Sequence, residues 1–301
     1  GLVSVSAFML YDLPLQILAQ RFYTGVASST WIAIPLFILA GTLMGQGGLS
    51  RRLVNFADSL LGRIRGGLGV TTIFSAAFFS SISGASPATA AAIGSVMIPE
   101  MKRKQYPEEL AAGITAAGGV LGVLIPPSII LIAYGVLAEV SIVDLFIAAL
   151  IPGLLVALAL MVVTWFMVRR LAGPTRERFE WAVVGQSFRD GFLSLLAPVI
   201  ILGGIYLGIF TPTESAAVAV VYGLLVGLWY RELTWAGIWD CLRTTIITTG
   251  ALGIIWAAAS SYSYVLTLSG ITQQLVAGIL GLASDPLVLL LLISLLVVVL
   301  G

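Results

Sequence analysis

An apolar segment of this chain, residues 66–100, has basic residues at both of its ends. Arg63 and Arg65 precede it, and Lys102 with the next two residues follows it. Because clusters of Lys and Arg mark the cytoplasmic side of a membrane, we expect both ends on that side. The polar run SISGASPAT leaves two arms of about 12–14 residues, or about 20 Å of helix, whereas a hydrocarbon core is about 30 Å thick. The segment is therefore predicted to be a re-entrant helical hairpin. Such hairpins are typical of transporters, because irregular backbone at membrane depth needs protein or a cavity around it.

The composition places the chain among polytopic helical membrane proteins. Hydrophobic residues make up 59% of its 301 residues and charged residues 10%. Several mostly apolar stretches reach the length of about 20 residues that a membrane-spanning helix needs. The chain begins without Met and ends within an apolar run, so we expect a further element beyond each end.

Enzyme functions are disfavoured by what the sequence lacks. The chain has no histidine, which excludes a Ser–His dyad and an H-E-x-x-H zinc site within it. It has no acidic pair within one span and no phosphate-binding loop of the form G-x-x-x-x-G-K-[ST]. We therefore predict that the protein is not an enzyme and has no cofactor other than a coupling ion.

The other apolar stretches are predicted to cross the membrane in alternating directions. The predicted spans cover residues 27–47, 109–138, 145–168, 192–210, 212–230 and 244–268. The predicted interfacial helices cover residues 12–26, 50–65, 231–243 and 271–285. On this topology all of the 15 Lys and Arg residues except Arg21 lie on the cytoplasmic side, as the positive-inside rule requires.

A short internal similarity indicates an inverted repeat. Residues 48–54 (GLSRRLV) resemble residues 270–276 (GITQQLV), and each copy follows an apolar span. The first copy carries two arginines and is expected inside, whereas the second carries two glutamines and is expected outside. An inverted-topology repeat requires this difference. The predicted fold class is an all-α polytopic membrane protein with inverted-topology repeats, re-entrant hairpins and discontinuous helices.

The repeat divides the chain into five predicted parts. Residues 1–65 hold the scaffold span and interfacial arm helix of the first repeat, and residues 66–138 hold the hairpin with a broken helix. Residues 139–190 form a connecting span and a cytoplasmic loop. Residues 191–285 hold the scaffold spans and arm helix of the second repeat, and residues 286–301 begin a second hairpin.

The tip of the first hairpin has residues that end one helix and begin another. Gly84 is predicted to end the first arm in the left-handed conformation. Ser86 is then predicted as the N-cap of the second arm and Pro87 as its first helical residue. Alternatively, the hydroxyls of Ser83, Ser86 and Thr89 only cap helix ends.

A second interruption lies within the span 109–138. Glycines at 118, 119 and 122 precede the pair Pro126-Pro127, which removes helix hydrogen bonds near the middle of the bilayer. The alternative is a plain helix kink at the two prolines. Two broken segments at one depth favour a binding site, because free carbonyl and hydroxyl oxygens suit Na⁺ and helix N-termini suit a carboxylate.

We predict a shared site between the hairpin tip and the second interruption. The predicted Na⁺ ligands are hydroxyl or carbonyl oxygens of Ser83, Ser86, Gly119, Gly122 and Pro126. The predicted contacts to a carboxylate substrate are Ser83, Gly84, Ser86, Thr89, Pro127 and Ser128. We also expect the hairpin and the broken helix to move as one rigid unit, because separating them would destroy this site.

The run TPTES at residues 211–215 fits a capping box. Thr211 would be the N-cap, Pro212 the first helical residue, and Glu214 the side chain that reaches back. A contact of Glu214 with a substrate or partner is the alternative.

Four motifs together resemble one transporter family. They are PLFILAGTLM at 35–44, SGASPATAAAIGSVMIPEM at 83–101, GVLIPPSIILIAYGVLAEVSI at 122–142 and GIFTPTESAAVAV at 208–220. In this order they resemble the large membrane subunit (M subunit, DctM-like) of tripartite ATP-independent periplasmic (TRAP) transporters, over essentially the whole chain. The family tip is often SGSA or SGSS, whereas this chain has SGAS, which moves the expected oxygen ligand to Ser86.

The resemblance implies Na⁺-coupled uptake of an organic acid, such as a dicarboxylate or sialic acid, by an elevator motion. It implies two protein partners, a small four-helix membrane subunit (Q type) and a periplasmic substrate-binding protein (P type), and a multi-pass location in the bacterial or archaeal cytoplasmic (inner) membrane. The lipid bilayer is then a further partner, and nucleic acid is not. The alternatives are a passive channel and a non-transporting membrane scaffold. A channel predicts a continuous polar stripe along several spans, which the sequence lacks. A scaffold predicts no breaks at mid-membrane.

Overall fold

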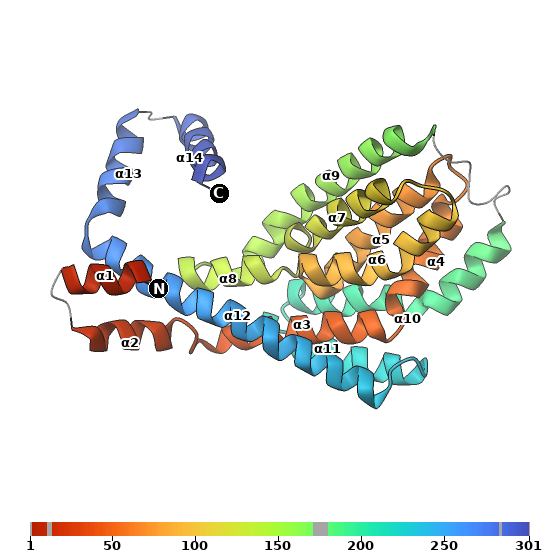
Figure 1. Ribbon diagram of the computed structural model, residues 1–301, viewed down its shortest axis with the longest axis horizontal. Helices are drawn as coiled ribbons and strands as arrows, with labels where there is room; N and C mark the ends of the chain where they lie inside the picture. Colours follow the sequence, from red (N-terminus) through yellow and green to blue (C-terminus); the bar gives the residue numbers. More distant parts are fainter. Residues whose placement is uncertain (1, 11–13, 171–179, 283–284, 301) are drawn as a thin grey trace. The chain divides into compact units, whose positions relative to one another are not determined.

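The computed structural model describes residues 2–10, 14–170, 180–282 and 285–300. Within these ranges the regular elements are all helices, and six helical segments are long and apolar enough to cross a membrane. This confirms the prediction of an all-α polytopic membrane protein (Figure 1). The chain forms two compact units, residues 28–250 and residues 1–27 with 251–301.

Each unit is built only from helices. The unit of residues 28–250 contains η1 (Ser29–Ile32), α3 (Ala33–Gln46), α4 (Leu49–Leu61), α5 (Gly67–Ser83), α6 (Ser86–Arg103), α7 (Glu108–Leu124), α8 (Ile129–Ala138), α9 (Ile142–Val168), α10 (Trp181–Tyr206), α11 (Pro212–Trp229) and the first part of α12 (Trp235–Leu268). The unit of residues 1–27 and 251–301 contains α1 (Leu2–Leu10), α2 (Leu15–Thr24), the rest of α12, α13 (Ile271–Leu282) and α14 (Pro286–Leu300).

The hairpin of α5 and α6 lies at the centre of the larger unit, beside α7 (Figure 1). The two arms are antiparallel, because contacts pair the end of α5 with the start of α6 and the start of α5 with the end of α6. The Ser83 and Thr89 hydroxyls are 2.8 Å apart, and the Thr72 hydroxyl is 4.0 Å from the Met101 sulfur. All residues of α5 are buried except Phe74 and two others, which are partly exposed. This arm therefore lies inside the unit.

The hairpin arms are longer than the sequence predicts. α5 has 17 residues and α6 has 18, rather than the predicted 12–14 or so, and only two residues connect them. The serines near the tip belong to α5, and their hydroxyls are satisfied within that helix, Ser80 by the Ala76 carbonyl at 2.7 Å and Ser81 by the Phe78 carbonyl at 2.6 Å. A re-entrant path through the membrane stays a prediction.

Two predicted boundaries are wrong. The residues predicted as an interfacial helix at 231–243 and a span at 244–268 form one helix, α12, from Trp235 onward. Thr234 starts it by accepting a hydrogen bond from the Gly237 amide at 3.1 Å, and no proline interrupts it. Likewise α10 begins at Trp181, well before the predicted span at 192–210. Part of the predicted cytoplasmic loop, residues 171–179, lies outside the described residues.

The two copies of the predicted repeat have similar local structure. Gly48 precedes α4 with φ of +80° and Gly270 precedes α13 with φ of +70°, a backbone conformation that favours glycine. In each copy one helix ends two residues before this glycine and the next helix begins directly after it. The opposite membrane orientation of the copies, and the five predicted parts of the chain, stay predictions.

Two groups of helices pack closely within residues 28–250. In the first, α5, α6 and α7 pack against one another, and α9 packs against α5 and α7. In the second, α11 packs against α3 and α10, while α4 packs against both α10 of this group and α5 of the first. Hydrogen bonds tie α10 to α11, from the Ser215 hydroxyl to the Ile201 carbonyl at 3.0 Å and from Tyr222 to the Leu193 carbonyl at 2.6 Å.

Candidate functional site

The tip of the hairpin is a two-residue turn at Gly84 and Ala85. Gly84 has φ of +63° and its amide donates to the Ser80 carbonyl at 3.1 Å, which confirms that it ends the first arm in the left-handed conformation. The predicted N-cap is wrong, because α6 begins at Ser86 and the extended residue before it is Ala85. Pro87 is therefore the second helical residue of α6 and not, as predicted, the first. Proline is tolerated there because the first four amides of a helix have no helical acceptor.

The hydroxyls at the tip join the two arms and do not cap them. Ser80, Ser83 and Thr89 are fully buried. The Ser83 and Thr89 hydroxyls are 2.8 Å apart, and those of Ser80 and Thr89 are 3.5 Å apart. Neither α5 nor α6 has a side-chain cap at the tip, so the alternative that these hydroxyls serve only as caps is wrong.

The second interruption separates α7 from α8 at residues 125–128. α7 runs through all three glycines to Leu124, so the break lies at the prolines and not at the glycines. Pro126 and Pro127 have no amide hydrogen, so they cannot donate to the carbonyls of Gly122 and Val123, four residues earlier. These two carbonyls therefore have no donor from the next helical turn.

Ser128 starts α8 on the far side of the break. It is fully buried, and its hydroxyl accepts a hydrogen bond from the Leu131 amide at 3.5 Å. Both Gly119 and Gly122 lie within α7, but the carbonyl of Gly119 has a helical donor in the amide of residue 123.

The hairpin tip and the break are in direct contact. The Ile129 amide donates to the Gly84 carbonyl at 3.0 Å. A Cβ atom on Gly84 would lie 2.5 Å from the Pro127 carbonyl oxygen, and one on Gly122 would lie 2.7 Å from the Ala85 carbonyl carbon. Glycine at both positions therefore allows the two backbones to approach. We name this region, residues 83–89 with 122–129, the junction.

The structure brings the predicted site residues together. Gly122 lies against the backbone of Ala85 and Ser86, and the space beside Gly119 is filled by Ala90 and the Ser86 carbonyl. Gly84 and Ser128, with Ser83, Thr89, Pro126 and Pro127, are buried, and Ser86 is partly buried. No hydrogen bond to the Ser86 hydroxyl occurs among the described residues, so this oxygen is available to a ligand. Their roles as ligands stay predictions.

One residue at the junction was missed by the sequence reasoning. Gly41 of α3 faces the tip, since its Cβ would lie 2.8 Å from the Ser83 Cβ. A glycine among large apolar residues in a span was the available signal. Within the described ranges no three His, Cys, Asp or Glu side chains gather to hold a metal ion, so hydroxyl and carbonyl oxygens are the available ligands there.

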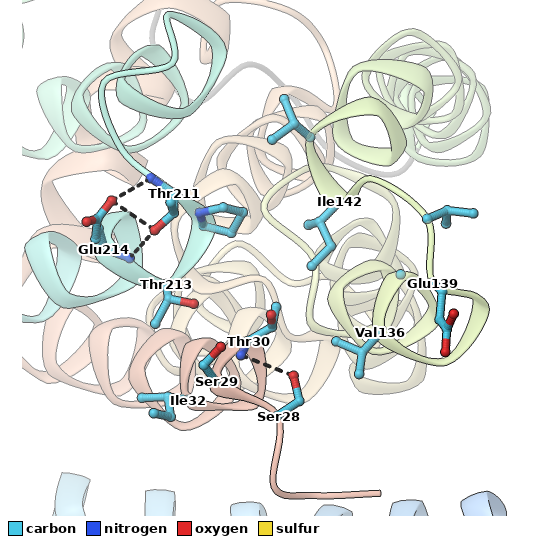
Figure 2. Close-up of a pocket in the computed structure, with 14 residues that line it drawn as sticks. Ser28, Ser29, Thr30, Ile32, Val136, Glu139, Ile142, Thr211, Thr213 and Glu214 are labelled. Atoms are coloured by element: carbon cyan, nitrogen blue, oxygen red, sulfur yellow. Dashed lines mark hydrogen bonds between the residues drawn. The ribbon is translucent and has the colours of Figure 1, made fainter. Parts of the chain in front are cut away.

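A pocket of about 690 Å³ lies at the other end of α8 (Figure 2). It is lined by η1, the turn between α8 and α9, and the start of α11. α8 is about 15 Å long, so this pocket is separate from the junction. Glu139 and Glu214 line it together with several hydroxyl side chains, and it has no basic lining residue.

The predicted capping box at the start of α11 is confirmed (Figure 2). The Glu214 amide donates to the Thr211 hydroxyl at 3.2 Å, and the Thr211 amide donates to the Glu214 carboxylate at 2.8 Å. Glu214 therefore has a structural role in starting α11. It also lines the pocket, and its contact with a substrate or partner stays a prediction.

The chain matches, over residues 1–301, the family described as tripartite ATP-independent periplasmic transporter, DctM component. The chain belongs to this family. The DctM family comprises transporter permeases, in agreement with the prediction that the chain is not an enzyme. Family membership and the six apolar helical segments place it in the bacterial inner membrane.

Three relatives show the extent of the similarity. The isethionate TRAP transporter permease protein DctMQ of Oleidesulfovibrio alaskensis is 41% identical, over 96% of this chain and 46% of its own length. The sialic acid TRAP transporter large permease protein SiaM of Vibrio cholerae is 39% identical, over 94% of this chain and 66% of its own length. The C4-dicarboxylate TRAP transporter large permease protein DctM of Pseudomonas aeruginosa is 40% identical, over 94% of this chain and 67% of its own length. The chain thus spans from under half to about two thirds of these relatives.

Proposed function

We propose that this chain is part of a transporter that takes up an organic acid together with Na⁺ by an elevator motion. The observation that carries the proposal is the contact between the hairpin tip and the broken helix, through the hydrogen bond from the Ile129 amide to the Gly84 carbonyl. A non-transporting scaffold has no need of two interrupted helices that meet, and a passive channel predicts a continuous polar stripe along its spans, which the sequence lacks.

The junction offers both signs of partial charge. The C-terminal ends of α5, at Ser83, and of α7, at Leu124, carry partial negative charge. The N-terminal ends of α6, at Ser86, and of α8, at Ile129, carry partial positive charge. A cation beside an anion suits such a group of helix ends, as in discontinuous helices of secondary transporters.

Na⁺ would be held by oxygen atoms of the junction. The Ser86 hydroxyl and the Gly122 carbonyl are the strongest candidates, because neither has a partner from its own helix. The Ser83 hydroxyl and the Pro126 carbonyl complete the proposed set, and Gly119 contributes less because its carbonyl has a helical donor. Oxygen ligands without a carboxylate suit a monovalent ion that must also be released, since divalent sites recruit Asp or Glu.

The proposed substrate is an organic anion. The relatives above are named for isethionate, sialic acid and C4-dicarboxylates, each of which is an organic acid. Its acidic group would contact the start of α6 and of α8, near Thr89, Pro127 and Ser128. A small four-helix membrane subunit and a periplasmic substrate-binding protein are the proposed partners, with the binding protein delivering the substrate.

The two groups of packed helices provide the proposed moving and static parts. The moving unit is α5 to α8, because α7 packs on both hairpin arms and α8 is bonded to the tip. We place α9 with it, since α9 packs on α5 and α7. The static frame is α3, α10 and α11.

Uptake in proteoliposomes tests the proposed function. The complete complex with both partners would be given radiolabelled succinate, N-acetylneuraminate or isethionate under an inward Na⁺ gradient. We expect one of them to accumulate above its external concentration, and an equal K⁺ gradient to give only background. Uptake that equilibrates without accumulation and ignores Na⁺ would support the passive channel and contradict the proposal.

A further inference from the structure

A second pocket, of about 550 Å³, lies on the basic side of the unit formed by residues 28–250. It is lined by the start of α4, the middle of α10, and the end of α11 with the loop that follows. Three arginines line it, Arg51, Arg52 and Arg189, against the two carboxylates of Asp190 and Glu232. The formal charge of the lining is therefore +1, from three positive and two negative side chains.

Arg52 and Glu232 neutralise each other. The Arg52 guanidinium donates to the Glu232 carboxylate at 2.6 Å and to the Gly48 carbonyl at 3.1 Å. Its Cζ atom also lies 3.6 Å from the centre of the Tyr230 ring. The Tyr230 hydroxyl in turn donates to the Asp190 backbone carbonyl at 3.1 Å. Arg52 is thus held in place and links α4 to the loop after α11.

The other two arginines are available to a ligand. The Arg51 guanidinium is 3.8 Å from the Glu232 carboxylate, and its side chain is 66% exposed, so this ion pair is weak. Arg189 has no hydrogen bond or ion pair among the described residues. With Arg52 paired to Glu232, these two arginines outnumber the remaining carboxylate of Asp190. The pocket therefore suits an anion.

The surroundings of the pocket favour a lipid as the source of the anion. Trp229 is the last residue of the span formed by α11, and 79% of its surface is exposed. Phe192 of α10, which also lines the pocket, is 47% exposed. Exposed aromatic residues at the end of a span mark the level of the lipid headgroups. Basic pockets between membrane helices on the cytoplasmic side bind anionic headgroups.

We propose that this pocket binds the headgroup of an anionic phospholipid of the cytoplasmic leaflet. The phosphodiester contacts Arg51 and Arg189, which extend from α4 and α10, and the glycerol and acyl carbons lie along Phe192 and Trp229. Bound lipid thereby reinforces the direct packing of the predicted arm helix α4 against the frame helix α10. This site is independent of the ion and substrate site proposed at the junction.

Lipid titration followed by native mass spectrometry tests this proposal on the complete complex. We expect dioleoylphosphatidylglycerol to bind with a saturable Kd and dioleoylphosphatidylcholine not to. With both arginines replaced (Arg51→Gln with Arg189→Gln), binding should weaken about 30-fold, because each surface arginine near anionic lipid contributes about 1 kcal/mol. The matched control, Arg63→Gln with Arg65→Gln, removes two exposed charges from the same side outside the pocket and should change Kd less than about twofold.

A single variant separates binding from folding. Arg189→Gln removes no hydrogen bond or ion pair of the described residues, so its Tm in phosphatidylcholine should equal that of the wild type while its phosphatidylglycerol binding weakens about fivefold. Equal weakening in the control pair, or displacement of the lipid by millimolar inorganic phosphate, would overturn the proposal in favour of nonspecific charge or a soluble anion. Loss of the small membrane subunit from the arginine variants with lipid binding unchanged would also overturn it, since the pocket would then be a protein interface.

Discussion

A disulfide between Gly45→Cys and Ala92→Cys is expected to abolish uptake. Gly45 lies in the frame helix α3 and Ala92 in the hairpin arm α6, and a Cβ on Gly45 would lie 3.4 Å from the Ala92 Cβ. This separation is close to the Cβ spacing of about 3.5–4.5 Å in disulfides. If the hairpin moves past α3 as a rigid body, the crosslink holds it in one state. Uptake should fall at least tenfold or so and return after reduction.

The matched control is a disulfide within the moving unit. Ala76 of α5 and Gly118 of α7 are also an Ala–Gly pair, with a Cβ on Gly118 2.9 Å from the Ala76 Cβ. This spacing is below the disulfide range of about 3.5–4.5 Å, so the two helices must separate slightly to accept the bond. A crosslink between Ala76→Cys and Gly118→Cys should leave uptake largely intact, because the two helices move together. The native Cys241 is buried and is not expected to compete. Uptake that persists with the first crosslink, or disappears with the second, would contradict motion of α5 to α8 as one body.

Replacement of Gly122 by alanine is expected to reduce uptake at least about tenfold, because the tip and α7 can no longer touch. The added Cβ would lie 2.7 Å from the Ala85 carbonyl carbon and 2.8 Å from the Ser86 amide nitrogen. Both are backbone atoms, so the junction must open to make room. Overpacking of this kind costs about 1–3 kcal/mol.

The same helix provides the control for this variant. Gly113 of α7 is exposed, and a Cβ there would have no neighbour within 4 Å. Gly113→Ala should retain full uptake and gain about 0.5–1 kcal/mol of stability, because alanine favours a helix more than glycine does. Uptake assays with Tm measurements on both variants distinguish the effects. Equal uptake in Gly122→Ala and Gly113→Ala would show that close contact at the junction is not needed.

Sequence patterns predicted the parts of the fold that depend on one segment at a time. Gly84 could be assigned because a left-handed turn between two helices requires glycine, and the capping box of Thr211 and Glu214 lies within four residues. The length of the hairpin arms was underestimated, because serines near a helix end read as loop residues whereas Ser80 and Ser81 bond back to their own helix.

Features formed by segments far apart in the chain could not be predicted in this way. The proximity of Gly41 to Ser83 depends on the packing of α3 against the hairpin. The basic pocket depends on the ion pair between Arg52 and Glu232, which are distant in sequence. The single helix α12 was divided because residues 231–243 resemble an amphipathic interfacial helix, although nothing after Trp235 stops a helix.

The Na⁺ dependence of uptake by a Ser86→Ala variant tests the central claim most directly. Uptake would be measured in proteoliposomes with both partners over a range of Na⁺ concentrations. Loss of one oxygen ligand should weaken Na⁺ binding by about 1.4 kcal/mol. The Na⁺ concentration for half-maximal uptake should therefore rise about tenfold. The control is Ser95→Ala on the same helix, where the exposed hydroxyl bonds only to the Ala92 carbonyl of its own helix, and its Na⁺ response should equal that of the wild type. A Ser86→Ala variant with an unchanged half-maximal Na⁺ concentration would contradict the claim that the hairpin tip binds the coupling ion.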